Sequence, residues 1–419
     1  MDLSHASYAA LITAAGGIAR GLRRALPAGW RLRLEARPPE DLPPGRWVWL
    51  HAVSVGELLL AEGFLRRLVA AGHRVHLTTG TPAGLALLQE RLPRWDGGTG
   101  RLSGGAFPVD DPRGLRPFLA SPPGTFIALE TELWPNLLST LRALGIPAMV
   151  VNGRLTARSR GPFVRAAVRD LTRVAARDAA SAETFLALGA REVELGGNLK
   201  ADLPPPPPLH GGWEALRAAW AGVPVLVAGN TVEGEEALVL DAWASARAAH
   251  PGLKLILAPR QPRRFDEAAR LLDARGLSFH RASRGWEAPW ATLDALLLDT
   301  LGELPRAYGE GTVALVGGGW RQAGGHNPLE PARFGMPVLL GPGYANFEDL
   351  VAPLLAAGAA EVVAEAALPE ALGAALRRAP LRPQASPEAP PPALASLLGA
   401  LDRTWSLVEP LLPRVQAPH

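Results

Sequence analysis

The 419-residue chain has no cysteine, only two lysines (Lys200 and Lys254) and no apolar run of membrane-spanning length. The absence of cysteine excludes disulfides, cysteine-ligated zinc, iron–sulfur clusters and thiol catalysis. It is also consistent with a reducing compartment. The formal net charge is only +3, and the pI near 9.7 arises because nearly all of the basic residues are arginines. A net charge this small does not indicate general nucleic-acid binding. We therefore expect no nucleic-acid partner.

The N-terminus carries a weakly apolar run from Tyr8 to Ala19 that is broken by Gly16 and Gly17 and followed by arginines. A transmembrane helix needs about 20 apolar residues, so this run does not predict one. A cleaved signal peptide is disfavoured because the arginines follow the run. Two interpretations stay open: an ordinary surface helix, or an amphipathic element that rests on anionic lipid through its arginines.

Short runs rich in Val, Leu and Ile alternate with amphipathic stretches along the chain, as in parallel strands joined by crossover helices. In the first half the predicted strands are Trp47–Ala52, Val75–Thr79, Phe126–Leu129, Ala148–Asn152, Val174–Ala176 and Val193–Leu195. In the second half they are Val225–Ala228, Leu255–Ala258, Leu277–His280, Ala295–Leu298, Val313–Val316, Val338–Leu340 and Glu361–Val363.

Five consecutive prolines lie in the stretch "ADLPPPPPLHGG", residues 201–212. Such a run lacks amide donors and favours an extended tether, so we place a domain boundary there. The predicted organisation is an N-terminal domain over 1–203, a linker over 204–212, a C-terminal domain over 213–392 and a last helix over 393–419, which packs on either domain. The fold class is α/β: two Rossmann-like doubly wound domains that face each other across a cleft, with the carboxyl ends of both sheets toward a shared ligand.

Glu57 stands at the start of the helix that follows the first buried strand, after a turn made by Ser54 to Gly56. A glutamate in that position is often only a favourable partner for the helix dipole. The alternative is a general base that projects into the cleft and takes a proton from a hydroxyl. Both interpretations stay open on composition alone.

Two more carboxylates, Glu130 and Glu132, come directly after the strand Phe126–Leu129. Burying unpaired carboxylates is costly, so their place at a strand end favours a polar cleft over a core. One of them is expected to pair with Arg154.

The most specific stretch is "GGGWRQAGGHNPLEPARFGMPVLLGP", residues 317–342. Glycines before a helix let backbone amides reach a phosphate, and the helix dipole favours the anion. Glu330 is placed to accept hydrogen bonds from ribose hydroxyls, and the alternative is a glycine-rich hairpin without a ligand. The residues that we expect to bind a nucleotide here are Gly324, Gly325, His326, Asn327 and Glu330.

Small or basic residues also follow other strands of the second predicted sheet. Arg260 offers bidentate contacts to a phosphate. Asn230 and Thr231 are predicted just after one strand, and Gly302 and Glu303 at a helix start after another. Each of these features is weak evidence alone. Together they place small, basic or glycine-rich residues at the ends of successive strands of one sheet.

The order of "HAVSVGE", "ETELWPNLL", "NGRLTARS", "GNLK", "GEE", "PRQPRRF", "DTLGEL" and "GGHNPLE" resembles the 3-deoxy-D-manno-oct-2-ulosonic acid (Kdo) transferases of lipopolysaccharide assembly, over about residues 46–365. The resemblance implies a GT-B fold and transfer of Kdo from CMP-Kdo to a lipid A precursor. It also implies inversion at the anomeric carbon, no metal, no cofactor, and a peripheral location on the inner face of the cytoplasmic membrane.

Carried over residue by residue, the resemblance makes Glu57 the general base and Glu130 the acceptor-side glutamate of the ETELW motif. Arg260 matches the family's PRHP arginine, and the loop with His326, Asn327 and Glu330 matches its CMP-binding loop. Among the residues that we expect to bind the acceptor are Ser54, Gly56, Glu132 and Arg154.

Two positions depart from the family pattern: Gln261 and Val232 stand where the family has histidines. If either histidine serves the donor phosphate, this chain binds CMP-Kdo more weakly or uses another donor. The competing functions are thus a related GT-B transferase with another nucleotide sugar, or a non-catalytic membrane-associated homologue.

Overall fold

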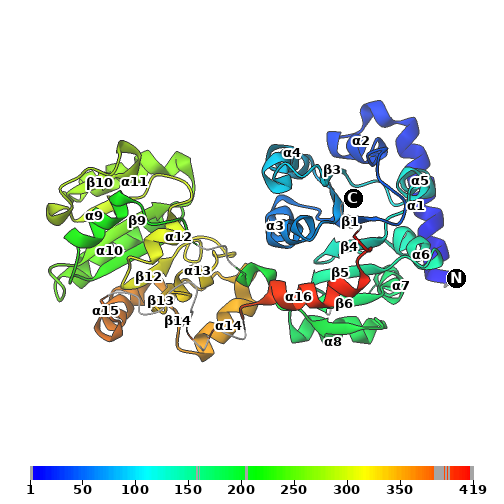
Figure 1. Cartoon of the computed structure of the whole chain (residues 1–419). Coiled ribbons are helices and arrows are strands. Elements are labelled where there is room, and N and C mark those ends of the chain that lie inside the picture. The colour runs from blue at the N-terminus through cyan, green and yellow to red at the C-terminus, as the bar shows by residue number, and fades with distance from the viewer. Residues whose placement is uncertain are drawn as a thin grey trace. The chain divides into compact units, whose positions relative to one another are not determined.

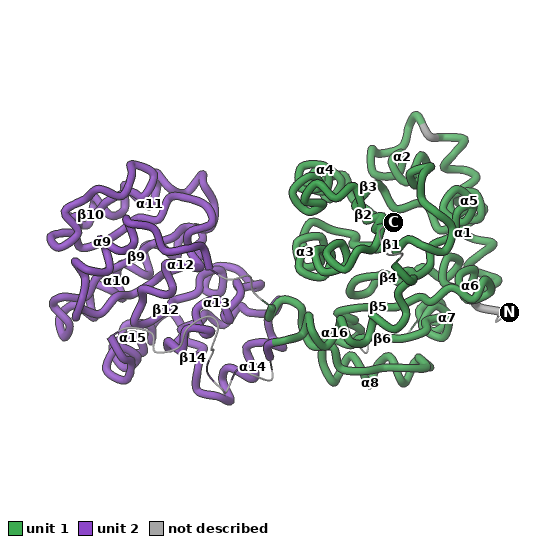
Figure 2. The backbone as a smooth tube through the Cα atoms, in the orientation of Figure 1, with its two compact units in different colours: residues 1–202, 399–419 green, residues 203–398 purple. Residues whose placement is uncertain are grey.

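The computed structural model describes residues 3–156, 159, 161–202, 206–381, 391, 394 and 397–415. The chain forms two compact units, residues 1–202 with 399–419 and residues 203–398 (Figure 2). Of the expected linker over 204–212, residues 204 and 205 lie outside the described residues, and the helix α9 starts at Gly211.

The first unit is built on a sheet of seven parallel strands in the order β3-β2-β1-β4-β5-β6-β7 (Figure 1). The strands are β1 (Trp47–His51), β2 (Arg74–Thr79), β3 (Leu102–Ala106), β4 (Thr125–Leu129), β5 (Ala148–Gly153), β6 (Arg173–Ala176) and β7 (Val193–Leu195). Six of them were predicted, and β3 was not. Its sequence LSGGA carries little apolar signal, because α4 packs so closely that a Cβ on Gly104 would lie 2.9 Å from Leu88.

Helices cover both faces of this sheet, so each face has its own apolar core. One core joins the sheet to α5 through α8 and contains Trp49 stacked on Phe118 with ring centroids 4.6 Å apart. The other joins it to α3, α4 and α16. The helices are α1 (Leu3–Gly21), α2 (Ala28–Leu34), α3 (Val55–Ala70), α4 (Pro82–Asp96), α5 (Pro112–Ala120), α6 (Pro135–Ala143), α7 (Pro162–Asp170), α8 (Ala179–Leu188) and α16 (Ala400–Val408).

The C-terminal helix α16 belongs to the first unit, a choice that the sequence left open. The Asp202 carboxylate accepts the N–H groups of Gly399, at 2.8 Å, and Leu401 at the start of this helix. Trp405 packs edge-on against Phe64 of α3. The chain therefore leaves the first unit at residue 202 and returns to complete its core.

The second unit repeats the architecture with a sheet in the order β10-β11-β9-β8-β12-β13-β14. Its strands are β8 (Val225–Thr231), β9 (Lys254–Pro259), β10 (Phe279–Arg281), β11 (Ala295–Leu297), β12 (Val313–Val316), β13 (Val338–Leu340) and β14 (Ala360–Val362). Its helices are α9 (Gly211–Ala219), α10 (Glu235–Arg247), α11 (Phe265–Ala274), α12 (Leu304–Tyr308), α13 (Leu329–Ala332), α14 (Glu348–Ala356) and α15 (Leu368–Arg378). All seven predicted strands are present, and the prediction of a doubly wound α/β chain is confirmed.

The N-terminal run forms helix α1, which lies against α6 and α7. The Tyr8 hydroxyl donates to Asp110 at 3.0 Å, and the Arg20 guanidinium makes two bonds to Asp111 at 2.5 and 2.6 Å. Gly16 permits this approach, since a Cβ there would lie 2.0 Å from the Asp111 carboxylate. Among the described helices, none combines the length and apolar character of a membrane span.

Trp405→Ala is expected to destabilise the first unit by about 3–5 kcal/mol, because it removes a buried aromatic side chain and leaves a cavity. Urea unfolding followed by circular dichroism measures this loss. Ser406→Ala, an exposed position on the same helix, is the control and should change stability by less than about 0.5 kcal/mol. A loss of similar size in both variants would contradict the packing role of α16.

Candidate active site

The strand order of each sheet reverses at one place, and ligands of doubly wound folds bind outside the carboxyl ends of the strands there. In the first sheet this place lies between the neighbours β1 and β4. In the second it lies between β8 and β12. Glu57 and Glu130 follow the first pair of strands, and the glycine-rich loop follows β12, so both positions coincide with predicted site residues.

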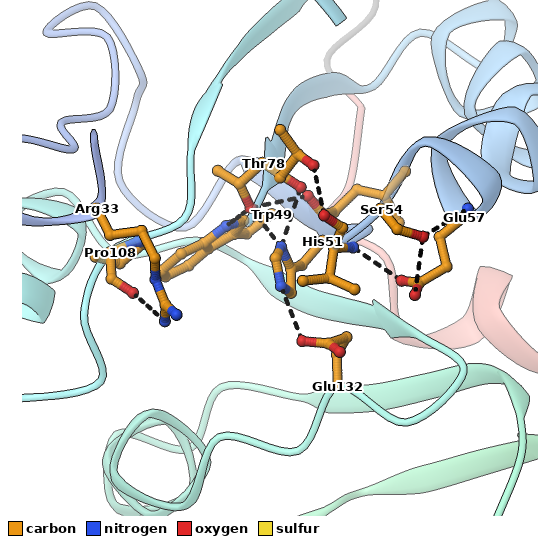
Figure 3. Close-up of polar contacts among 11 residues, drawn as sticks. Arg33, Trp49, His51, Ser54, Glu57, Thr78, Pro108 and Glu132 are labelled. Atoms are coloured by element: carbon orange, nitrogen blue, oxygen red, sulfur yellow. Dashed lines mark hydrogen bonds and ion pairs between the residues drawn. The ribbon is translucent and has the colours of Figure 1, made fainter. Parts of the chain in front are cut away.

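Glu57 is held in the first turn of α3 by reciprocal hydrogen bonds (Figure 3). Its N–H donates to the Ser54 hydroxyl at 3.3 Å, and its carboxylate accepts the N–H of Val53 at 2.8 Å. The arrangement resembles a capping box, which satisfies N–H groups that the first helical turn leaves unpaired. Glu57 thus has the structural role of a helix-start residue, and its half-buried carboxylate has a fixed position.

The surroundings of Glu57 raise the pKa of its carboxyl to about 7. Burial is the main cause, and the nearby charges of Glu132 and Glu130 add to it, while the Val53 N–H opposes it. The structure therefore brings the three predicted carboxylates together at one sheet edge. A carboxyl with a pKa near neutrality is suited to accept a proton at physiological pH.

Glu130 has a strained backbone, with φ at 52°. The left-handed region is costly for a non-glycine residue, and such strain clusters at functional sites. Asn152 at the end of β5 has the same φ of 52°, and its side-chain amide lies 3.5 Å from the Glu130 carboxylate. The turn after β4 is thereby fixed with Glu130 at the edge of the sheet.

Glu132 faces His51, a residue that the sequence analysis did not assign to the site (Figure 3). The His51 ring is fully buried, and its Nε2 lies 3.3 Å from the Glu132 carboxylate. Its Nδ1 lies 3.0 Å from the Thr78 carbonyl, which only accepts, so this contact places a proton on Nδ1. Nε2 then needs a second proton to donate to Glu132. Burial is the main cause that lowers the pKa of His51 below its usual value, and Glu132 acts in the opposite direction.

Arg33 of α2 is a second residue that the sequence analysis missed. Its guanidinium lies 4.7 Å from the centre of the Trp134 ring and donates to the Pro108 carbonyl at 3.1 Å. Burial lowers the pKa of Arg33, and Glu132 and Asp110 act in the opposite direction. Arg33 supplies positive charge beside the carboxylates. The sequence analysis missed it because it lies in a seven-residue helix that carries no recognisable motif.

The predicted ion pair of Arg154 is wrong. Within the described part of the chain its side chain pairs with neither Glu130 nor Glu132, and only its backbone N–H contacts Glu130, at the carbonyl, 3.2 Å away. Gly56 is exposed in the first turn of α3, where a Cβ would meet little of the protein.

In the second unit, β8 runs to Thr231, so Asn230 and Thr231 belong to the strand and do not follow it. The Thr231 side chain is fully buried, and its hydroxyl lies 3.4 Å from Glu236. It therefore faces the interior and not a ligand. Asn230 is half-buried with φ at 56°, a conformation that asparagine tolerates.

Arg260 lies near His326 and Glu330 although it is distant from both in sequence. Burial and the charge of Arg260 lower the pKa of His326 to about 4. Burial raises the pKa of Glu330 to about 7, against Arg260 and Arg333. His326 is therefore neutral at pH 7, and its buried Nε2 has no hydrogen-bond partner in the described structure.

The glycine loop before α13 is folded on itself. Gly325 has φ at 64° and donates its N–H to the Gly318 carbonyl at 3.1 Å. Asn327 caps α13 by accepting the N–H of Leu329 at 3.0 Å. Because α13 has only four residues, any attraction for an anion comes from individual backbone amides, and the expected helix dipole is small.

Gly302 and Glu303 precede α12 as expected. Gly302 has φ at 91°, which only glycine adopts easily. The Glu303 carboxylate accepts the indole N–H of Trp213 at 2.8 Å and lies 3.7 Å from His210. The Glu303 side chain thus links α12 to α9, a structural role that the sequence motif did not predict.

Comparison with known proteins gives one family. Residues 28–203 match the family described as 3-deoxy-D-manno-octulosonic-acid transferase (kdotransferase). The chain is 39% identical over 363 residues to the 3-deoxy-D-manno-octulosonic acid transferase of Bordetella pertussis, covering 81% of this chain and 82% of the relative. It is 33% identical over 385 residues to the protein of that name from Haemophilus influenzae, covering 89% and 88%.

Two solved structures share the fold at low sequence identity. The UDP-GlcNAc 2-epimerase from Neisseria meningitidis bound to UDP-GlcNAc matches with a TM-score of 0.52 at 14% identity, over 88% of this chain and 100% of the other. CalG4, the calicheamicin glycosyltransferase, matches with a TM-score of 0.50 at 14% identity, over 89% and 99%. These likenesses confirm the predicted GT-B architecture and concern the fold alone.

The raised pKa of Glu57 makes stability depend on pH. The native state binds this proton more tightly than the unfolded chain, whose carboxyl has a pKa of 4.5, so stability falls as pH rises from 4.5 to about 7 and is then level. Relative to the wild type, Glu57→Gln should therefore gain roughly 1–2 kcal/mol over this range, after allowance for solvent screening. Urea unfolding at pH 5, 6, 7 and 8 measures the difference. Glu62→Gln on the same helix is the control, and a flat difference for Glu57→Gln would refute the shift.

Proposed function

This chain belongs to the Kdo transferase family, and from that premise we propose that it transfers Kdo from CMP-Kdo to a lipid A precursor, with inversion and without a metal. The glycosyltransferase family is shown by the relatives, whereas donor, acceptor and stereochemistry are our proposal. The observation that carries the mechanism is the fixed Glu57 carboxyl, with a pKa of about 7, at the carboxyl end of β1.

In the proposed reaction, Glu57 accepts the proton of the acceptor hydroxyl as its oxygen attacks the anomeric carbon of Kdo. The bond from that carbon to the CMP phosphate oxygen breaks, and CMP leaves with the bonding electrons. Opposite-face attack inverts the carbon. The base works in its ionised form, so the rate is expected to rise with pH through about 7.

The acceptor side is proposed to use Glu130 as the second catalytic carboxylate. Its charge, with that of Glu132, raises the pKa of Glu57, and Nε2 of the buried His51 lies 3.3 Å from the Glu132 carboxylate. Ser54 contacts Glu57 at the start of α3, and the neighbouring Gly56 is exposed. We propose Ser54, Gly56, Glu132 and Arg154 as its binding residues.

The donor side is proposed to use Arg260 and the loop 324–327 for the CMP phosphate. Arg260 carries the positive charge, because His326 is neutral at pH 7. Such groups stabilise the leaving phosphate most as charge develops on it. Glu330 is proposed to accept from the ribose, with Asn230, Gly302 and Glu303 at neighbouring strand ends.

A second candidate function rests on the two departures from the family pattern. Gln261 accepts a hydrogen bond from Arg263 at 2.6 Å, and Val232 is buried with 6% of its surface exposed. Neither can bring positive charge to a phosphate, which favours weaker CMP-Kdo binding or a different nucleotide sugar. Competition by a panel of nucleotides for the donor site separates the two functions.

The test of the proposed reaction is incubation with CMP-Kdo and a lipid A precursor, with the lipid product weighed by mass spectrometry. Glu57→Gln is expected to lower kcat by about 10²- to 10⁴-fold because it removes the base. The CMP affinity, measured by calorimetry, should change by less than about 3-fold. Glu62→Gln serves as control, and a Glu57→Gln enzyme with most of its rate would not use Glu57 as base.

We propose that the first unit rests on the inner face of the cytoplasmic membrane through the outer side of α1 and α2. The inner side of α1 is held by Asp110 and Asp111. The outer side leaves large apolar residues 46% to 65% exposed, and Arg24 and Arg31 are exposed beside them. Apolar side chains next to arginines favour binding to anionic lipid. The exposed apolar residues are Leu11, Ile18, Leu22 and Trp30.

The double change Leu11→Glu with Ile18→Glu should lower binding to phosphatidylglycerol-containing vesicles by at least about 10-fold, since each such side chain contributes about 1.5–3 kcal/mol when buried. Cosedimentation measures the bound fraction. Leu186→Glu on α8, where the leucine is 54% exposed, is the matched control. Equal vesicle binding by the wild type, the double variant and Leu186→Glu would contradict a membrane contact through α1.

A further inference from the structure

Helix α10 begins with two adjacent glutamates, Glu235 and Glu236, and both are fully buried. A buried carboxylate is costly unless every oxygen finds donors. The two residues meet this need in different ways. Glu236 pairs with the Arg264 guanidinium at 3.0 Å, whereas Glu235 has no ion pair within the described chain.

Glu235 is satisfied by backbone alone. One carboxylate oxygen accepts the N–H groups of Val232 at 3.1 Å and Gly318 at 2.7 Å. The other accepts those of Trp320 at 2.9 Å and Arg321 at 3.3 Å. Because Val232 follows β8 and the other three residues follow β12, one side chain joins the two strand ends at the point where the strand order reverses.

The loop that Glu235 binds leads directly to the proposed donor residues. A Cβ on Gly318 would lie 2.7 Å from the His326 ring, so the ring packs on this glycine. The Gly318 carbonyl accepts the N–H of Gly325 at 3.1 Å. A shift of Gly318 is therefore transmitted to both Gly325 and His326.

We infer that Glu235 is a positioning residue for donor binding: it holds residues 318–321 so that Gly325 and His326 are arranged for the nucleotide phosphate. It acts through the loop and does not touch the substrate. This inference rests on the proposed function of that loop. It also gives the GEE motif two separate tasks, since Glu235 orders the loop and Glu236 anchors Arg264 within the unit.

The two glutamates provide a matched pair of variants, Glu235→Gln and Glu236→Gln. Glutamine keeps one acceptor oxygen but presents NH₂ where the other oxygen accepted two N–H groups, so two of the four backbone contacts are lost. We expect the donor KM and the CMP dissociation constant of Glu235→Gln to rise about 10- to 100-fold, as for loss of buried hydrogen bonds, with kcat within about 3-fold. Glu236→Gln should leave the donor KM within about 3-fold although it lowers thermal stability.

Hydrogen exchange of the backbone amides gives a readout that does not depend on activity. Residues 318, 320 and 321 should lose protection in Glu235→Gln and keep it in Glu236→Gln. If Glu235→Gln does not fold, Glu235→Asp retains the charge on a side chain one methylene shorter, and it should show a smaller rise in donor KM together with the same loss of protection.

The inference is overturned by unchanged protection at residues 318–321, by equal effects of the two glutamine variants on donor KM, or by a fall in kcat with constant KM. Failure of the wild type to bind CMP would instead remove the proposed donor site. The two failures are distinguishable because the exchange experiment is made on the free protein.

Discussion

Backbone N–H groups at the turns after the central strands need acceptors, and in both units a glutamate in the next helix supplies one. Glu57 accepts from Val53 after β1, and Glu235 accepts from Val232 after β8. An unpaired buried N–H is expensive, so this requirement fixes where each carboxylate lies before any substrate arrives. The rest of each site is arranged around that fixed group.

Burial then gives the two glutamates different chemistry. Glu57 is half-buried, makes few hydrogen bonds and has a raised pKa, so its carboxylate keeps the capacity to take a proton. Glu235 is fully buried, and its two carboxylate oxygens accept four backbone N–H groups. The same residue type at the same kind of turn is thus half-buried with a raised pKa in one unit, and fully buried against four backbone N–H groups in the other.

The two sheet edges also differ in charge. The first gathers Glu57, Glu130 and Glu132, and the second places Arg260 beside His326 and Glu330. In the proposed transfer, the neighbouring carboxylates raise the pKa of Glu57 and so favour its use as a base, and the Arg260 guanidinium stabilises the leaving phosphate. The proposed transfer needs both, and the chain divides them between its two units.

Alternation of apolar strands and amphipathic helices was enough to predict two doubly wound domains, because burial on both faces imposes that pattern locally. This alternation did not predict β3, where close packing against α4 selects glycine. It also ended β8 too early, because the strand continues past its apolar run to Thr231. The sequence by itself determined the positions of Glu57, Glu130 and the glycine loop at strand ends. Only the tertiary structure decided the surroundings of Arg33, His51 and Glu235, because each has partners on distant segments. The lowered pKa values of Arg33 and His51 arise from burial, which no local pattern encodes.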